Sequence, residues 1–176
     1  MSRTIGVCDL GKFCTLVATF WLCCLPVVSG AQSIAESDIV LTLEVVDAGG
    51  TQISQIDLDM HVLQARPAVT FETHTKWTDG PQVFKGVRLY DWLQELDIHD
   101  GEMMLTATND FKMTFPVNEV RRDGAIIAYE RNGRAMTRRD YGPLWLVFNY
   151  DSGPRYQTEK AYARSVWQLR HISVTQ

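Results

Sequence analysis

The residues with the clearest chemical potential lie in the stretch TFETHTKWTDGPQVFKGV, residues 70–87. This stretch places His74, Lys76 and Trp77 within four consecutive positions. An indole face can hold a flat ring by hydrophobic contact and offset stacking, and this geometry contributes about 1 kcal/mol beyond the area buried. The stretch therefore predicts a ligand contact through Trp77, and core packing of the same side chain is the alternative.

Three further tryptophans bear on the same question. Trp145 is a second candidate stacking residue, but it lies in the apolar segment GPLWLVF, where core packing is the stronger alternative. Trp92 and Trp167 fall at positions typical of the apolar face of a helix and of a strand, so we expect both in the core.

Polar candidates follow at the end of an apolar segment. Asn109 and Asp110 precede Phe111. An ionised carboxylate can accept two parallel hydrogen bonds from a planar nitrogen-rich edge, so this pair is a candidate ligand contact. Asn-Asp is also a common turn pair, which is the structural alternative.

Four side chains are candidates to face an anion or a carbonyl group: His74, Lys76, Arg164 and Ser165. Arginine suits a planar oxyanion because its donors form a fixed fork. The structural alternative for Arg164 is a surface ion pair with Glu159 or Glu130.

Several kinds of site are not expected. All four cysteines lie within the first 24 residues, and the four histidines show no spacing typical of zinc ligands. No G-x-S-x-G motif, phosphate loop or paired-carboxylate motif is present. We therefore predict no metal site and no catalytic residue.

Residues 1–31 are predicted to be a secretory signal peptide. Arg3 and Lys12 flank a polar start, the run FCTLVATFWLCCLPVV is almost entirely apolar, and Ser29-Gly30-Ala31 supplies small residues for cleavage. Cleavage near Ala31 predicts a periplasmic protein comprising residues 32–176. An uncleaved N-terminal anchor is the alternative.

The charges are unevenly distributed. The whole chain has a formal net charge of −4, yet ten basic and five acidic residues follow position 120. The C-terminal third can therefore present a local cationic surface on an acidic protein. This pattern suits a small anionic ligand better than nucleic acid, which usually needs a broad basic face.

The spacing of apolar residues predicts one α+β domain with short helices and a curved, mixed β-sheet. The expected strands cover residues 39–47, 51–60, 68–75, 103–107, 111–115, 125–131, 144–148 and 166–174. A helix is expected over residues 86–96, with helical turns at 116–122 and 159–164. Asn132-Gly133 predicts a type I′ hairpin turn.

Four segments in this order carry a resemblance to a known family. They are FKGVRLYDWLQEL (84–96), TATNDF (106–111), IIAYERNGRAMTRRDYGPLWLVF (126–148) and ARSVWQLRHISV (163–174). In sequence and order they resemble the molybdopterin-binding domain of the sulfite oxidase superfamily. The resemblance covers most of residues 32–176 and implies the fold of that domain.

The chain departs from the enzymes of that superfamily at one decisive position. Their molybdenum-ligating cysteine would fall near Thr73, and a threonine cannot supply the soft thiolate. Molybdenum is therefore not expected. The phrase THTKWTDG (73–80) is instead similar to that of short, cysteine-free periplasmic regulators of the PruR type, which bind a pterin.

The resemblance implies a non-enzymatic pterin-binding protein. The implied ligand is a pterin, with a tetrahydropterin as the candidate form. The implied partner is the periplasmic domain of an inner-membrane diguanylate cyclase or phosphodiesterase. A molybdopterin-dependent oxidoreductase is the alternative. The expected pterin-binding residues are Thr73, His74, Thr75, Trp77, Asn109, Asp110, Trp145, Arg164 and Ser165.

Overall fold

The computed structural model describes residues 39–176. The predicted signal peptide, residues 1–31, lies outside them, so its cleavage and the periplasmic location stay predictions. Within residues 39–176, no helix has the length and apolar character needed to span a membrane.

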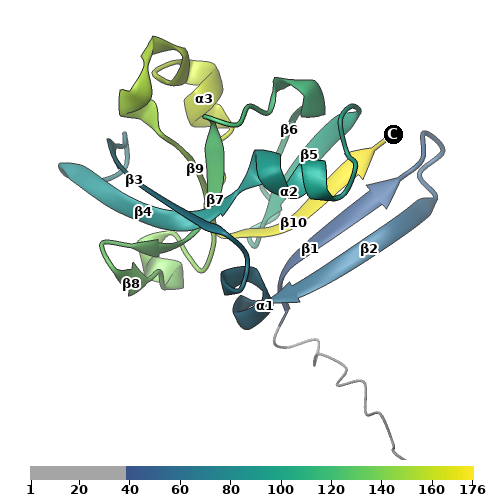
Figure 1. The fold of residues 1–176 in the computed structure, drawn as a ribbon, viewed down its shortest axis with the longest axis horizontal. Coiled ribbons are helices and arrows are strands. Elements are labelled where there is room, and N and C mark those ends of the chain that lie inside the picture. The colour runs from purple at the N-terminus through teal and green to yellow at the C-terminus, as the bar shows by residue number, and fades with distance from the viewer. Residues whose placement is uncertain (1–38) are drawn as a thin grey trace, which may run out of the picture. The chain divides into compact units, whose positions relative to one another are not determined.

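The first of two sheets joins the two ends of the described chain. It contains β1 (Ile39–Val46), β2 (Gln52–Asp59), β5 (Glu102–Ala107), β6 (Lys112–Pro116) and β10 (Leu169–Thr175), in the order β2-β1-β10-β5-β6. β1 and β10 run parallel side by side, and the other neighbours are antiparallel (Figure 1). This sheet is mixed, as expected.

The second sheet is antiparallel throughout. It contains β3 (Ala68–His74), β4 (Pro81–Arg88), β7 (Ala125–Arg131), β8 (Arg134–Ala135) and β9 (Trp145–Phe148). The order is β3-β4-β7-β8, and β9 pairs with β7. The α+β class is confirmed, but the prediction of a single mixed sheet is wrong because the strands divide into two sheets. The resemblance to the sulfite oxidase fold stays a prediction.

The β7–β8 hairpin has the predicted turn. Arg131 pairs with Arg134 across a two-residue loop. Asn132 and Gly133 have φ angles of +53° and +73°, as a type I′ turn requires at both central positions.

The helices are short, and each lies between two strands in the sequence. They are α1 (Met60–Gln64), α2 (Leu89–Glu95) and α3 (Glu159–Ala163), with 3₁₀ turns at Val117–Glu119, Arg138–Asp140, Tyr150–Ser152 and Pro154–Tyr156. At the start of α3, the Oγ1 atom of Thr158 accepts a hydrogen bond from the Ala161 amide at 3.2 Å, which caps the helix.

The predicted helix over residues 86–96 begins too early, because residues 81–88 form β4. Gly86 pairs with Ala128 of β7, and a Cβ atom at Gly86 would lie 2.1 Å from the carbonyl oxygen of Ile127. The glycine therefore allows two strands to approach closely, a role that helical spacing cannot reveal.

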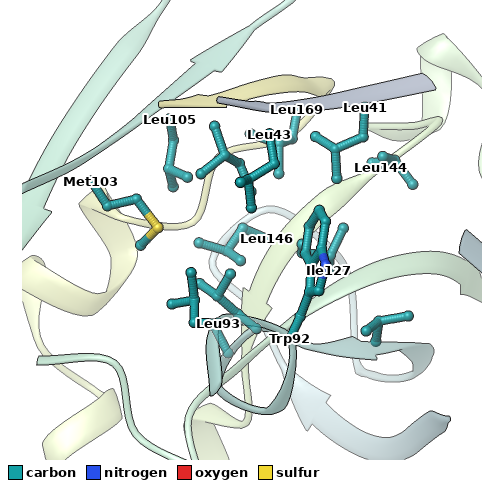
Figure 2. Close-up of a cluster of buried hydrophobic side chains, with 14 of the residues drawn as sticks. Leu41, Leu43, Trp92, Leu93, Met103, Leu105, Ile127, Leu144, Leu146 and Leu169 are labelled. Carbon is teal, nitrogen blue, oxygen red and sulfur yellow. The ribbon is translucent and has the colours of Figure 1, made fainter. Parts of the chain in front are cut away.

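The larger hydrophobic cluster is mostly aliphatic. Figure 2 shows Leu41, Leu43 and Leu105 gathered with Trp92, and all four side chains are at most 1 % exposed. The prediction that Trp92 is a core residue is confirmed. This cluster is called the aliphatic core below.

A second cluster is rich in aromatic rings. Its buried members are Phe84, Ile126, Ala128, Met136, Trp145, Val147, Tyr150 and Tyr156. Partly buried Trp77, Tyr141, Tyr162 and Trp167 pack against them. These residues, called the aromatic cluster below, form the background of the candidate site.

Candidate ligand-binding site

A pocket of about 380 Å³ opens beside the aromatic cluster. It is lined by Lys76, Trp77, Ala107, Asn109, Phe111, Glu159, Tyr162, Ala163, Ser165, Val166 and Trp167. The loop after β3, the β5–β6 turn, α3 and the segment before β10 all contribute. The volume is within the range of about 300–1,000 Å³ that small-molecule sites occupy, and the lining combines aromatic rings with a few polar groups.

Trp77 forms one wall of the pocket. Its backbone N–H donates to the Oγ1 atom of Thr75 at 3.1 Å, and its carbonyl oxygen accepts from the Tyr141 hydroxyl at 3.0 Å. Its ring meets Trp145 and Trp167 edge-on, with centroids 5.7 Å and 5.4 Å away. Trp77 therefore both packs on the aromatic cluster and presents part of its surface to the pocket.

Trp167 was expected in the core but lies half-buried in the pocket wall. The final strand begins at Leu169 instead of the predicted Val166, because Gln168 takes a φ angle of +53°. The Gln168 N–H donates to the carbonyl of Tyr141, and its carbonyl accepts from Thr108. This kinked connection takes Trp167 out of the β10 ladder and toward the pocket.

Tyr162 and Phe111 are pocket residues that the sequence did not identify. Tyr162 stacks on Tyr150 with centroids 4.9 Å apart and an interplanar angle of 27°. Phe111 is 47 % exposed, which is high for a large apolar ring. One sequence feature could have identified Phe111 as a pocket residue, namely its position directly after the Asn-Asp turn. Residues beside a turn lie at an end of the sheet, where binding sites are common.

Charged groups stand at the rim. The Nζ atom of Lys76 lies 3.9 Å from the centroid of the Tyr162 ring and 2.6 Å from the Oε1 atom of Glu159. The ammonium group thus makes a cation–π contact and an ion pair at once. Because Lys76 lines the pocket, its ammonium group is a candidate hydrogen-bond donor to a bound ligand.

Ser165 supplies a buried hydroxyl, as part of a hydrogen-bond chain. Its Oγ atom donates to the carbonyl of Ala161 at 2.8 Å and accepts from the hydroxyl of Tyr150. A phenol is protonated at neutral pH, so Tyr150 can donate, and burial raises its pKa further. The remaining lone pair of Ser165 is free to accept a further hydrogen bond.

Only one residue of the Asn109–Asp110 pair lines the pocket. Asn109 lines the pocket, and its Oδ1 atom accepts from the Phe111 amide at 3.2 Å. Asp110 has a φ angle of +63° and its carboxylate accepts from the Arg170 guanidinium at 2.9 Å, outside the pocket lining. The turn alternative is therefore correct for the backbone, and only Asn109 reaches the pocket.

Thr73 and His74 point to opposite faces of β3 and do not line the pocket. Thr73 is fully buried, and its hydroxyl accepts from the Asp151 amide at 3.1 Å. The exposed His74 ring lies 2.9 Å from the Asp151 carboxylate, and hydrogen bonds from the His74 ring and then from its amide lower the pKa of Asp151. Both residues fix the end of β3 against the Tyr150–Ser152 turn.

Thr75, Trp145 and Arg164 also lie outside the lining. Thr75 positions the loop through its bonds to Thr78 and Trp77. Trp145 is fully buried, which is the core-packing alternative.

Arg164 forms an ion pair, as its structural alternative predicted, but with a different residue. Its guanidinium lies 2.6 Å from Glu119 and over the ring of Phe115 at 4.3 Å. Neither Glu159 nor Glu130 is its partner, since Glu159 pairs with Lys76 and Glu130 with Lys85.

Among residues 39–176, no group of three or more histidine, aspartate or glutamate side chains is arranged to hold a metal ion. Of the candidates from the sequence, the structure brings four together at the pocket: Lys76, Trp77, Asn109 and Ser165. It adds Tyr162, Trp167 and Phe111. Comparisons with protein-family models and with curated proteins found no match.

Proposed function

We propose that this chain is a periplasmic pterin-binding signalling protein that regulates an inner-membrane cyclic di-GMP enzyme, a cyclase or a phosphodiesterase, through its periplasmic domain. The observation that supports the proposal most strongly is a pocket whose lining combines aromatic rings with the polar side chains of Asn109 and Ser165. The sequence resemblance to pterin-binding domains supplies the ligand class and the partner.

The chemistry of the lining suits a pterin. A pterin is a flat bicyclic ring with hydrogen-bond donors and acceptors along its edges, so it needs ring faces around it and polar groups at its perimeter. The side-chain amide of Asn109 supplies donors, Ser165 supplies an acceptor, and Lys76 supplies a charged donor at the rim. A compact ligand of this kind can reach micromolar affinity at a few tenths of a kcal/mol per atom.

The alternative, a molybdenum oxidoreductase, is less well supported by the donor set. Residues 32–176 contain no cysteine. The hydroxyl of Thr73, at the expected ligand position, bonds to the Asp151 amide and does not face the pocket. A soft metal centre would lack its thiolate.

Calorimetry with a tetrahydropterin tests the binding claim. Phe111→Ala removes an exposed ring that lines the pocket, so it should weaken binding about fivefold, from about 1 kcal/mol of lost ring contact. Ile53→Ala is the matched control, because Ile53 is 61 % exposed and lies in β2, away from the pocket lining. The proposal would be contradicted if the wild type did not bind the tetrahydropterin, or if Phe111→Ala and Ile53→Ala bound it with equal affinity.

The signalling claim and the alternative need separate readouts. Cellular cyclic di-GMP should change in cells that carry Phe111→Ala and stay at the wild-type level with Ile53→Ala. Stoichiometric molybdenum in protein purified from its natural compartment, with sulfite turnover above a no-protein control, would favour the oxidoreductase.

A further inference from the structure

A second cleft, of about 370 Å³, lies on the other side of α3 from the pterin pocket. Four cationic side chains line it: Arg121, Arg155, Lys160 and Arg164. One carboxylate, Glu119, lies among them. On a chain with a formal net charge of −4, this is a local surplus of positive charge.

Helix α3 is a wall shared by the two cavities. Glu159 and Tyr162 line the pterin pocket, whereas Lys160 and Ala161 line the cationic cleft. Anything that binds in the cleft therefore touches the same five-residue helix that holds one side of the pterin pocket.

The four cations of the cleft are not equivalent. Glu119 accepts hydrogen bonds from Lys160 at 2.7 Å and Arg164 at 2.6 Å, so these two are already paired. Arg155 lies 3.6 Å from Asp123 in an exposed, loose pair. Arg121 is exposed and has no ion pair with any residue of the range 39–176. The charge that remains for a ligand is thus at the rim.

This arrangement argues against a compact dianion such as phosphate. To reach Lys160 and Arg164, a small anion would have to approach the Glu119 carboxylate, which repels it. Exposed arginines at a rim instead attract extended groups with separated charges, since rim charges mainly steer association and align an incoming surface.

The lining of the cleft also contains two aromatic rings, those of Phe148 and Tyr156. Phe148 is half-buried and stacks on Tyr156, with centroids 5.7 Å apart. A peptide can cover such a ring with its side-chain methylenes while its carboxylates reach the rim, which phosphate cannot do.

We propose that the cationic cleft docks an acidic segment of a partner protein, with carboxylate side chains placed against Arg121 and Arg155. This inference rests on the proposed signalling function, because it gives that function a surface where the partner contacts α3. The binding event itself is measurable without pterin.

Fluorescence anisotropy with a labelled hexaglutamate peptide, at low and physiological salt, tests the docking surface. Wild type should bind the peptide with an affinity that falls as salt rises. Arg121→Glu and Arg155→Glu should each weaken binding about fivefold, because each reverses a rim charge. Arg139→Glu is the matched control, because it makes the same charge change at an exposed position outside the cleft lining.

Four outcomes would overturn the inference. They are equal weakening by Arg139→Glu, no peptide binding at low salt, displacement of the peptide by equimolar inorganic phosphate, and preference for phosphatidylglycerol vesicles over the peptide. Tryptophan fluorescence with a tetrahydropterin on the same variants separates the two proposals. If the wild type binds the peptide but not the tetrahydropterin, the pterin-binding proposal is refuted and the docking surface is not.

Discussion

The aliphatic core and the aromatic cluster solve different physical problems. Leu43 and Leu105 in the aliphatic core have no exposed surface, and branched side chains there fill space from all directions. In the aromatic cluster, Trp77 and Trp167 are only partly buried and meet edge-on at 5.4 Å. An edge-to-face contact covers a face of only one of the two rings, so partly buried rings can keep apolar surface exposed beside the pocket. The fully buried side chains of the aliphatic core expose no such surface.

The comparison predicts the largest loss of stability in the aliphatic core. Leu105→Ala removes a fully buried side chain from β5, an interior strand of the first sheet, and leaves a cavity. The free energy of unfolding should fall by about 2–5 kcal/mol, measured by urea denaturation. The affinity of the folded fraction for a tetrahydropterin should stay within twofold of wild type. A matching loss of affinity would show that the two clusters do not act separately.

Trp77→Ala should affect both properties. Truncation removes a half-buried ring with four aromatic neighbours, so about 2 kcal/mol of stability should be lost, less than for a fully buried tryptophan. Tetrahydropterin binding should weaken about tenfold or more from lost stacking. Trp77→Phe is the control and should recover most of the stability and most of the tetrahydropterin affinity.

Calorimetry and thermal melts on these two variants decide between the roles of Trp77. A large drop in melting temperature with unchanged affinity would make Trp77 a structural residue only.

The sequence predicted some of the residues that line the pocket, but not the geometry of the pocket. Trp77, Asn109 and Ser165 were expected at the site and line the pocket. Trp77 could be identified because a large apolar ring in a polar loop is expected to be covered either by packing or by a ligand. Residue type and local polarity, which are sequence properties, were sufficient for that inference.

The remaining pocket residues depend on long-range packing. Tyr162 reaches the pocket because α3 packs beside a loop that follows β3, more than 80 positions earlier in the chain. Asp110 does not line the pocket, and its carboxylate pairs with Arg170, which lies 60 positions later in the chain. Such pairings follow from strand order, and the division into two sheets was not predicted.

Within the aromatic cluster, the next effect concerns the bond between Tyr150 and Ser165. Ser165→Ala removes the acceptor of a buried phenol, which should cost about 1–3 kcal/mol in the free energy of unfolding because the hydroxyl stays buried without a partner. Tyr150→Phe in the Ser165→Ala background should restore part of that loss. A double-mutant cycle by chemical denaturation measures the coupling, and additive losses would mean that the two hydroxyls do not depend on each other.

The smallest effect is a pH dependence that comes from two buried phenols of the aromatic cluster, those of Tyr150 and Tyr156. Burial, and then the hydrogen bond that the Tyr156 hydroxyl donates to Asp123, raise the pKa of Tyr156 to about 12. An unfolded tyrosine has a pKa near 10, so above about pH 10 the folded protein binds more protons than the unfolded chain, and stability falls as pH rises toward 12. Burial likewise raises the pKa of Tyr150, which adds to the fall.

Tyr156→Phe should therefore be less stable than wild type at pH 8. It should lose less stability between pH 10 and about 12, because one of the two buried phenols of the aromatic cluster no longer titrates. Urea denaturation across this range measures the slopes. Leu105→Ala is the control, and its slope should equal that of the wild type because no titrating group has been removed. Equal slopes for Tyr156→Phe and wild type would show that the Tyr156 hydroxyl is not held protonated by the fold, and that the aromatic cluster is more open to water at Tyr156 than its 6 % exposure indicates.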